Sequence, residues 1–109
     1  MPEAVSEVFA ALAARFHPER ATGVDAVFQF EATGDDGGTW HLVVHDGTCA
    51  LGRGDVASPT VTLRASGETW LRIASGAVDP QRALLMGRLK LSGDMALALR
   101  LRTLFDLGR

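Results

Sequence analysis

Residues 86–99 constrain the fold of this chain more than any other stretch, because they join a short alternating segment to an apolar helix through two glycines. Gly87 permits the left-handed backbone at which a preceding helix ends. Residues 88–92 then alternate polar and apolar side chains, which is the pattern of a strand with one buried face. Gly93 interrupts that strand, and Asp94 is placed to cap a helix by accepting a hydrogen bond from the backbone amide three residues on. The stretch therefore predicts a helix end, a strand, a corner and a final helix.

The final helix carries more apolar surface than packing against a sheet requires. Its expected core stripe is formed by side chains that recur at helical spacing, namely Leu97, Ala98, Leu101, Leu104 and Phe105. Met95 and Leu99 lie on a second face of the same helix. We therefore expect something other than the sheet to cover Met95 and Leu99.

The rest of the chain contains segments with the hydrophobic period of a helix and segments with that of a strand. A helical stripe over residues 2–16 is formed by Val5, Val8, Phe9, Leu12 and Phe16. It ends at His17-Pro18, because a residue before proline is pushed out of the helical region. Asp46-Gly47 is a hairpin-turn signal between two strands, and pairing across that turn sets His45 opposite Thr48 and Val44 opposite Cys49. Ser66 and Asp79 are expected to cap two short helices. The strands are predicted over residues 24–32, 39–45, from 48 onward, 60–65 and 88–92, and Leu63 and Leu89 are expected on the inner faces of the last two.

These patterns predict an α+β fold with a five-stranded, mixed but mostly antiparallel sheet and helices on one face. The side chains expected beneath the helices are Phe28, Phe30, Trp40, Leu42 and Val44. Those expected to face water on the other side are His41, His45, Arg64 and Lys90. With 109 residues, the chain is expected to form a single domain over residues 1–109 with one core.

Composition argues against several classes of function. No segment approaches the ~20 continuous apolar residues of a membrane span, and no secretory leader pattern is visible, so the expected location is cytoplasmic. The net charge is −2 and the basic residues are scattered. This distribution argues against nucleic-acid binding, because phosphate contacts need a concentrated positive surface. A transient contact with a membrane and a homodimer stay open.

No set of side chains has the spacing of a catalytic or metal site. His41 and His45 share one face of a strand but lie roughly 13 Å apart, which is too far to hold one ion. Cys49, the single cysteine, is expected on the inward face as a small buried hydrophobe rather than a nucleophile. The serines fall at turns or helix ends, and there is no phosphate-binding glycine loop. The sequence therefore predicts a protein that is not an enzyme and that uses no metal or cofactor.

The stretch from Gly87 to Leu99 resembles the C-terminal signature of the sterol carrier protein type 2 (SCP-2) family, in which a glycine, a strand and a Gly-Asp turn lead into a final helix. The resemblance extends over residues 40–47, 60–65 and 70–80, so it covers nearly the whole chain except the first helix. It implies a lipid-binding domain with an apolar tunnel between sheet and helices. Because the chain is short and ends without a peroxisomal targeting signal, it is most similar to stand-alone bacterial members.

The resemblance and the surplus apolar face of the final helix together predict a ligand-binding lining. Unbranched methionines suit such a lining because they adapt to irregular apolar ligands. The predicted lining consists of Phe28, Phe30, Trp40, Trp70, Ile73, Leu85, Met86, Met95, Leu99 and Phe105. Two functions stay open. One is non-catalytic binding or transfer of a sterol, fatty acyl chain or similar apolar lipid, and the other is a dimerisation or accessory module of a lipid-related enzyme system.

Overall fold

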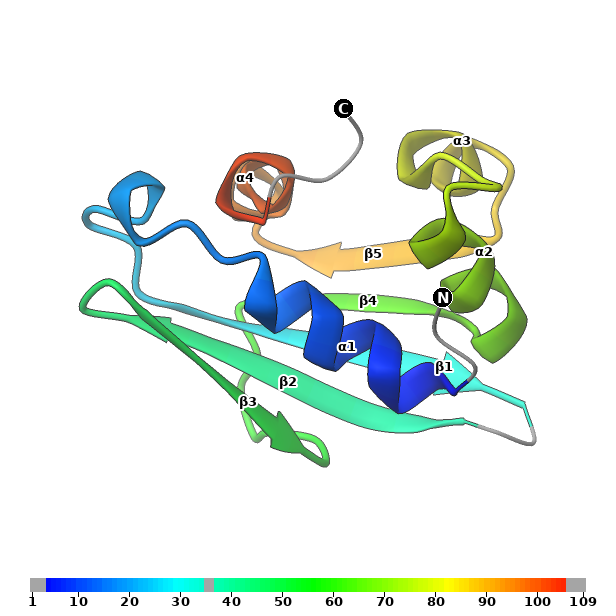
Figure 1. Cartoon of the computed structure of the whole chain (residues 1–109), viewed down its shortest axis with the longest axis horizontal. Coiled ribbons are helices and arrows are strands. Elements are labelled where there is room, and N and C mark those ends of the chain that lie inside the picture. The colour runs from blue at the N-terminus through cyan, green and yellow to red at the C-terminus, as the bar shows by residue number, and fades with distance from the viewer. Residues whose placement is uncertain (1–3, 35–36, 106–109) are drawn as a thin grey trace.

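The computed structural model describes residues 4–34 and 37–105, and its elements follow the predicted order (Figure 1). The helices are α1 (Val5–Ala14), α2 (Gly67–Ser75), α3 (Pro80–Leu85) and α4 (Met95–Leu104), with a short 3-10 helix η1 (Pro18–Arg20). The strands are β1 (Ala26–Thr33), β2 (Gly38–His45), β3 (Thr48–Arg53), β4 (Val61–Ser66) and β5 (Leu89–Gly93). Helix α1 ends earlier than predicted, and η1 was not predicted. The first residues of the predicted first helix and the Asp35-Asp36 turn lie outside the described residues.

The five strands form one mixed sheet in the order β3-β2-β1-β4-β5. Central strand β1 pairs antiparallel with β2 and parallel with β4, and the two outer pairs are antiparallel. The predicted hairpin register is confirmed, since His45 lies opposite Thr48 and Val44 opposite Cys49. Asp46 and Gly47 both have positive φ, at 50° and 72°, as the predicted turn requires. The predicted fold class is therefore confirmed.

The helices cover one face of the sheet, and α1 lies across it in Figure 1. Phe9 of α1 is fully buried at the centre of an aromatic cluster. Its ring centroid lies 5.0 Å from those of Phe30 and Trp40 and 5.1 Å from that of Trp70. The five sheet side chains expected under the helices are all buried, namely Phe28, Phe30, Trp40, Leu42 and Val44. The prediction that these five side chains face the helices is thus confirmed.

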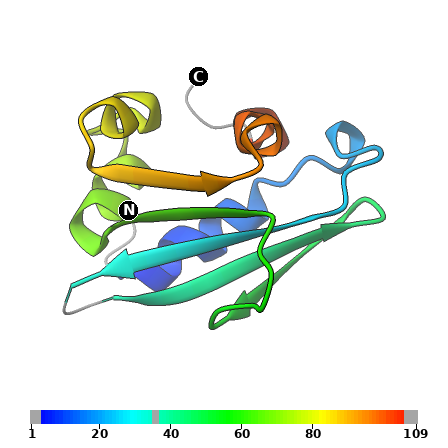
Figure 2. The same cartoon turned by 180° about the vertical axis from the view of Figure 1, so that it is seen from behind.

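The outer face of the sheet is less open to water than predicted. Residues 54–60 connect β3 to β4 and must cross β2 and β1, because β4 pairs with the far side of β1 (Figure 2). The crossing segment is fixed by a 2.9 Å hydrogen bond from the Val56 amide to the Gln29 side-chain oxygen, and Gln29 is buried. His41 is half-buried, with Nδ1 2.8 Å from the Gly54 carbonyl oxygen. The expectation that His41 faces water was therefore wrong, whereas His45, Arg64 and Lys90 are exposed.

The corner before α4 forms as predicted. Gly93 has φ 103°, and a side chain there would collide with the Thr60 carbonyl oxygen. The Asp94 carboxylate accepts a 3.1 Å hydrogen bond from the Leu97 amide and caps α4. Leu101, Leu104 and Phe105 are buried, and Leu97 and Ala98 pack against the core. Among residues 4–34 and 37–105, no helix has the length and apolar character needed to span a bilayer.

Candidate functional site

A groove of about 550 Å³ opens between α1, the α2–α3 segment and the sheet. Its volume lies in the range of small-molecule sites, roughly 300–1,000 Å³. One wall is formed by α1 and the residue that follows it, through Val8, Phe9, Ala11, Leu12 and Arg15. Residues 70–80 form the other wall, through Trp70, Ile73, Ala74, Ser75, Gly76, Val78, Asp79 and Pro80. The remaining lining comes from Phe30 of β1, Leu63 of β4, Leu89 of β5 and Leu101 of α4. Seven helices and strands, together with the connection between α2 and α3, therefore meet at one mostly apolar hollow.

The wall formed by α2 is positioned by a cap at the start of the helix, by a hydrogen bond from Trp70 to the sheet and by a glycine at the helix end. The Ser66 hydroxyl oxygen accepts a 3.0 Å bond from the Thr69 amide and caps the helix start. The Trp70 indole nitrogen donates a 3.0 Å bond to the Glu31 carbonyl oxygen of β1, which ties the ring to the sheet. Gly76, with φ 85°, ends the helix. These bonds hold Trp70 and Ile73 against the groove.

The polar side chains of the groove lining are few, and two of them already serve the local backbone. The Ser75 hydroxyl donates a 3.1 Å hydrogen bond to the Arg72 carbonyl oxygen. The Asp79 carboxylate accepts bonds of 3.1 and 3.3 Å from the first amides of α3. Arg15 completes the charged part of the lining. Such a site can exclude water from an apolar molecule, and no acid, base and nucleophile are paired among the described side chains of its lining.

Cys49 lies outside this groove, on the inner face of β3. Burial raises the pKa of the Cys49 thiol to about 11. The thiol is therefore neutral near pH 7, and the thiolate is the form that acts as a nucleophile. Its environment is that of a small core side chain.

The ten residues predicted to bind a ligand fall into three groups. Phe30, Trp70 and Ile73 line the groove. Phe28, Trp40 and Phe105 are buried in the core and do not contribute to the lining. Leu85, Met86, Met95 and Leu99 are exposed and also lie outside the lining.

Sequence reasoning assigned several groove residues to helix docking or to the core alone. Val8, Leu12 and Leu101 are members of the predicted core stripes, and Leu63 and Leu89 are members of the predicted inner strand faces. They line the groove because it is a gap between α1, the α2–α3 segment and the sheet, and these residues border that gap. No signal within one segment marks that gap, since it depends on how α1, α2 and α4 are spaced.

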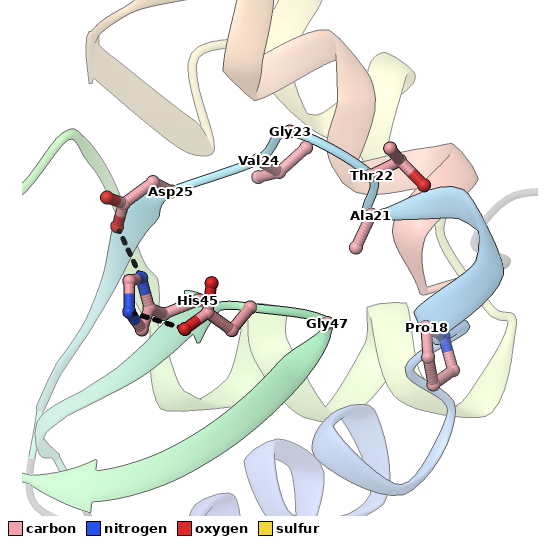
Figure 3. A pocket seen from close by; sticks show the side chains of 9 residues that line it. Pro18, Ala21, Thr22, Gly23, Val24, Asp25, His45 and Gly47 are labelled. Carbon is pink, nitrogen blue, oxygen red and sulfur yellow. Dashed lines mark ion pairs between the residues drawn. The ribbon is translucent and has the colours of Figure 1, made fainter.

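A second, smaller hollow of about 340 Å³ lies between η1, the segment leading into β1 and the β2–β3 turn (Figure 3). The His45 ring pairs with the Asp25 carboxylate, as Figure 3 marks, and its Nδ1 lies 3.3 Å from that carboxylate. Nε2 of the same ring lies 3.1 Å from the Asp46 carboxylate. All three side chains are mostly exposed, so solvent screens the pairs. Within the described part of the chain, no group of three or more His, Cys, Asp or Glu side chains could hold a metal ion.

Three comparisons with known proteins bear on the groove. The profile of the SCP-2 sterol transfer family matches residues 9–106. Hydroxysteroid dehydrogenase-like protein 2 of Bos taurus is 33% identical over 104 residues, which are 94% of this chain and 25% of the relative. The chain thus spans between a fifth and a quarter of the length of the curated relatives it matches first.

Solved structures with the same fold include Sterol Carrier Protein 2 Like 2 from Aedes aegypti. Its crystal structure has a TM-score of 0.76 and 27% identity, and the match covers 91% of this chain and 94% of that chain. The solution structure of palmitated SCP2L2 from Aedes aegypti has a TM-score of 0.75 and 27% identity, with 94% of each chain covered.

Proposed function

Because the chain belongs to the SCP-2 sterol transfer family, we propose that its groove binds an apolar lipid and shields it from water without changing it chemically. The observation that carries this proposal is the groove of about 550 Å³ with its mostly apolar lining. The ligand classes we propose are a fatty acyl chain, a sterol or a similar lipid. The palmitated state of the Aedes aegypti relative makes palmitate the first ligand to test.

Burial of apolar surface is sufficient to drive such binding. Covering ~400 Å² of apolar ligand at ~25 cal/mol/Å² offers about 10 kcal/mol before the costs of association. Phe30, Trp70 and Ile73 supply aromatic and branched surface on two sides of the groove. We propose these three, together with Leu12 and Leu63, as the principal ligand contacts.

The hydrogen bonds of the polar side chains in the groove lining support binding rather than catalysis. Ser75 and Asp79 are engaged at helix ends. The lining contains no histidine or cysteine. A carrier needs neither, because release of an unchanged lipid requires only that the groove reopen.

A second proposal is that the domain serves as an accessory module of a lipid-related enzyme, by presenting a bound lipid or by pairing with a partner or a second copy. It is supported by the relatives named as dehydrogenase-like proteins, of which the chain matches about a quarter. The two proposals share the groove and differ in whether a protein partner is needed.

The groove is tested by calorimetric titration of palmitate into wild type and two matched variants. Ile73→Asp places a carboxylate in the lining and should weaken binding about tenfold or more, because an unpaired charge facing hydrocarbon is costly. Leu99→Asp makes the same chemical change on an exposed surface outside the groove and should leave the affinity unchanged.

Lipid extraction and mass spectrometry of the natively purified protein give an independent readout. A bound lipid in wild type that is depleted in Ile73→Asp supports the carrier. Equal palmitate affinity in both variants, with no extractable lipid, would contradict binding in this groove. Light scattering on Leu99→Asp then tests self-association, since loss of a dimer would favour the accessory module.

A further inference from the structure

Helix α3 exposes its large apolar side chains and buries its small one. Leu84, Leu85 and Met86 are 40%, 87% and 57% exposed, whereas Ala83 is fully buried. We call residues 82–88 the α3 tip. Leu51, Met95 and Leu99 are the other exposed large apolar residues of the described part of the chain, but only at the tip do three of them follow one another directly. Exposed apolar patches of this kind mark interaction sites.

The fold holds the α3 tip in this orientation. The Asp79 carboxylate caps the helix start, and the Arg88 amide donates a 2.9 Å hydrogen bond to the Ala83 carbonyl oxygen. The Gly87 amide bonds the Leu84 carbonyl oxygen at 3.2 Å, which completes the helix end. The buried Ala83 and this closed turn fix Leu85 and Met86 outward.

The charge around the α3 tip favours an anionic partner. Arg82 and Arg88 bracket the three apolar side chains and are exposed, and neither forms a side-chain hydrogen bond or ion pair within the described residues. No acidic residue occurs between Asp79 and Asp94, although the chain as a whole has a net charge of −2. Basic side chains therefore flank the apolar tip along the chain, and the nearest acidic residue in sequence is Asp79, which caps α3.

We propose that the α3 tip is a docking surface for an anionic lipid bilayer. A protein interface of standard size buries about 800 Å² on each partner, which is far more than one six-residue helix presents. Shallow insertion of a few apolar side chains, with flanking arginines at the anionic headgroups, suffices for reversible attachment. Arginine suits this place because its stem lies along apolar surface while its charge stays in water.

The α3 tip adjoins the groove at both of its ends. Val78, Asp79 and Pro80 precede it, Leu89 follows it, and all four line the groove. A domain docked through α3 therefore brings one groove wall to the bilayer surface. The relevance to lipid exchange rests on the proposed function, whereas the docking itself does not.

Vesicle flotation tests the docking with the ligand-free protein. Wild type should bind vesicles of phosphatidylcholine mixed with phosphatidylserine better than vesicles of phosphatidylcholine alone, and rising salt should weaken that preference. Leu85→Ser with Met86→Ser should lower the partition coefficient about tenfold or more on the mixed vesicles. Arg82→Gln with Arg88→Gln should lower it by about fivefold per arginine on the mixed vesicles only.

Control variants carry substitutions of the same kind on other surfaces. Leu51→Ser changes an exposed leucine of β3, and Arg53→Gln with Arg64→Gln removes two exposed charges from β3 and β4. Both controls should float with the vesicles much as wild type does, and circular dichroism checks that every variant is folded. Equal loss in tip and control variants, or no binding by wild type, would overturn the proposal. A dimer that Leu85→Ser dissociates, without vesicle binding, would instead identify the tip as a protein interface and would equally overturn it.

Discussion

Helices α2 and α3 follow one another between β4 and β5, but α2 buries its largest apolar side chain whereas α3 exposes its large ones. Each begins at a capping side chain, and each is followed by a glycine with positive φ. Helix α2 buries Trp70, its largest residue, whereas α3 buries Ala83 and exposes Leu85. Similar local signals therefore fixed both helices, and only the packing decided which side of each faces the core. Apolar content alone does not show whether a side chain is inside.

Removing the large side chain that α2 buries should have the greatest effect on stability. Trp70→Ala should lower the free energy of unfolding by about 3–5 kcal/mol, because it leaves a cavity beside Phe9 and Phe30 and removes the partner of the Glu31 carbonyl oxygen. Urea unfolding followed by circular dichroism measures this loss. A loss below about 1 kcal/mol would mean that α2 is no better anchored than α3.

Gly87 and Gly93 lie at the two ends of β5, where the chain turns from α3 into the strand and from the strand into α4. Both have positive φ, so valine at either position costs roughly 1–3 kcal/mol of backbone strain. A side chain at Gly87 meets open space, whereas one at Gly93 collides with the Thr60 carbonyl oxygen. Gly93→Val should therefore destabilise more than Gly87→Val, as thermal unfolding can show. If Gly93→Val melts with wild type, the corner has no special backbone requirement.

The two helix caps should contribute about equally. Ser66→Ala and Asp79→Ala each remove a side-chain acceptor from the first turn of a helix, and each should cost about 1 kcal/mol. The comparison of unfolding free energies is made in one buffer. If Asp79→Ala alone leaves the free energy of unfolding unchanged, α3 is held by its contact with β5 rather than by its N-terminal cap.

The smallest effect is expected at the exposed end of α3. Leu85→Ser should change the free energy of unfolding by no more than about 0.5 kcal/mol, since most of the side chain is already in water. Its melting curve should overlay that of wild type. A clear destabilisation would show that Leu85 packs against a part of the molecule, and the contrast between α2 and α3 would then fail.

Local periodicity predicted the parts of this fold that depend on neighbours in sequence. The hairpin register around Asp46-Gly47, the cap at Asp94 and the inner face that carries Phe28 and Trp40 were all predicted and are confirmed. Strand alternation says which face a residue occupies but not which strand lies beside it. The crossing of residues 54–60, and with it the burial of Gln29, therefore escaped prediction.

The groove was predicted in kind but only partly in its residues. Phe30, Trp70 and Ile73 were predicted to bind a ligand and do line the groove. Leu12 also lines it but was predicted only as part of a core stripe, and Leu63 and Leu89 only as parts of inner strand faces. Such residues become a lining only when α1 and α2 stand apart above the sheet. That spacing is a property of the assembled layers, and no single segment encodes it.

The positions of the two tryptophans give the protein a built-in optical reporter. The chain contains Trp40, Trp70 and no tyrosine, so all strong near-ultraviolet emission comes from these two rings. Trp70 borders the groove, whereas Trp40 lies under Phe9 with the Arg53 guanidinium 4.7 Å from its ring centroid. Trp40→Phe would leave a single emitter at the groove wall, whose spectrum shifts when a ligand displaces the water beside it. The filling and emptying of the groove could then be followed in real time without any attached label.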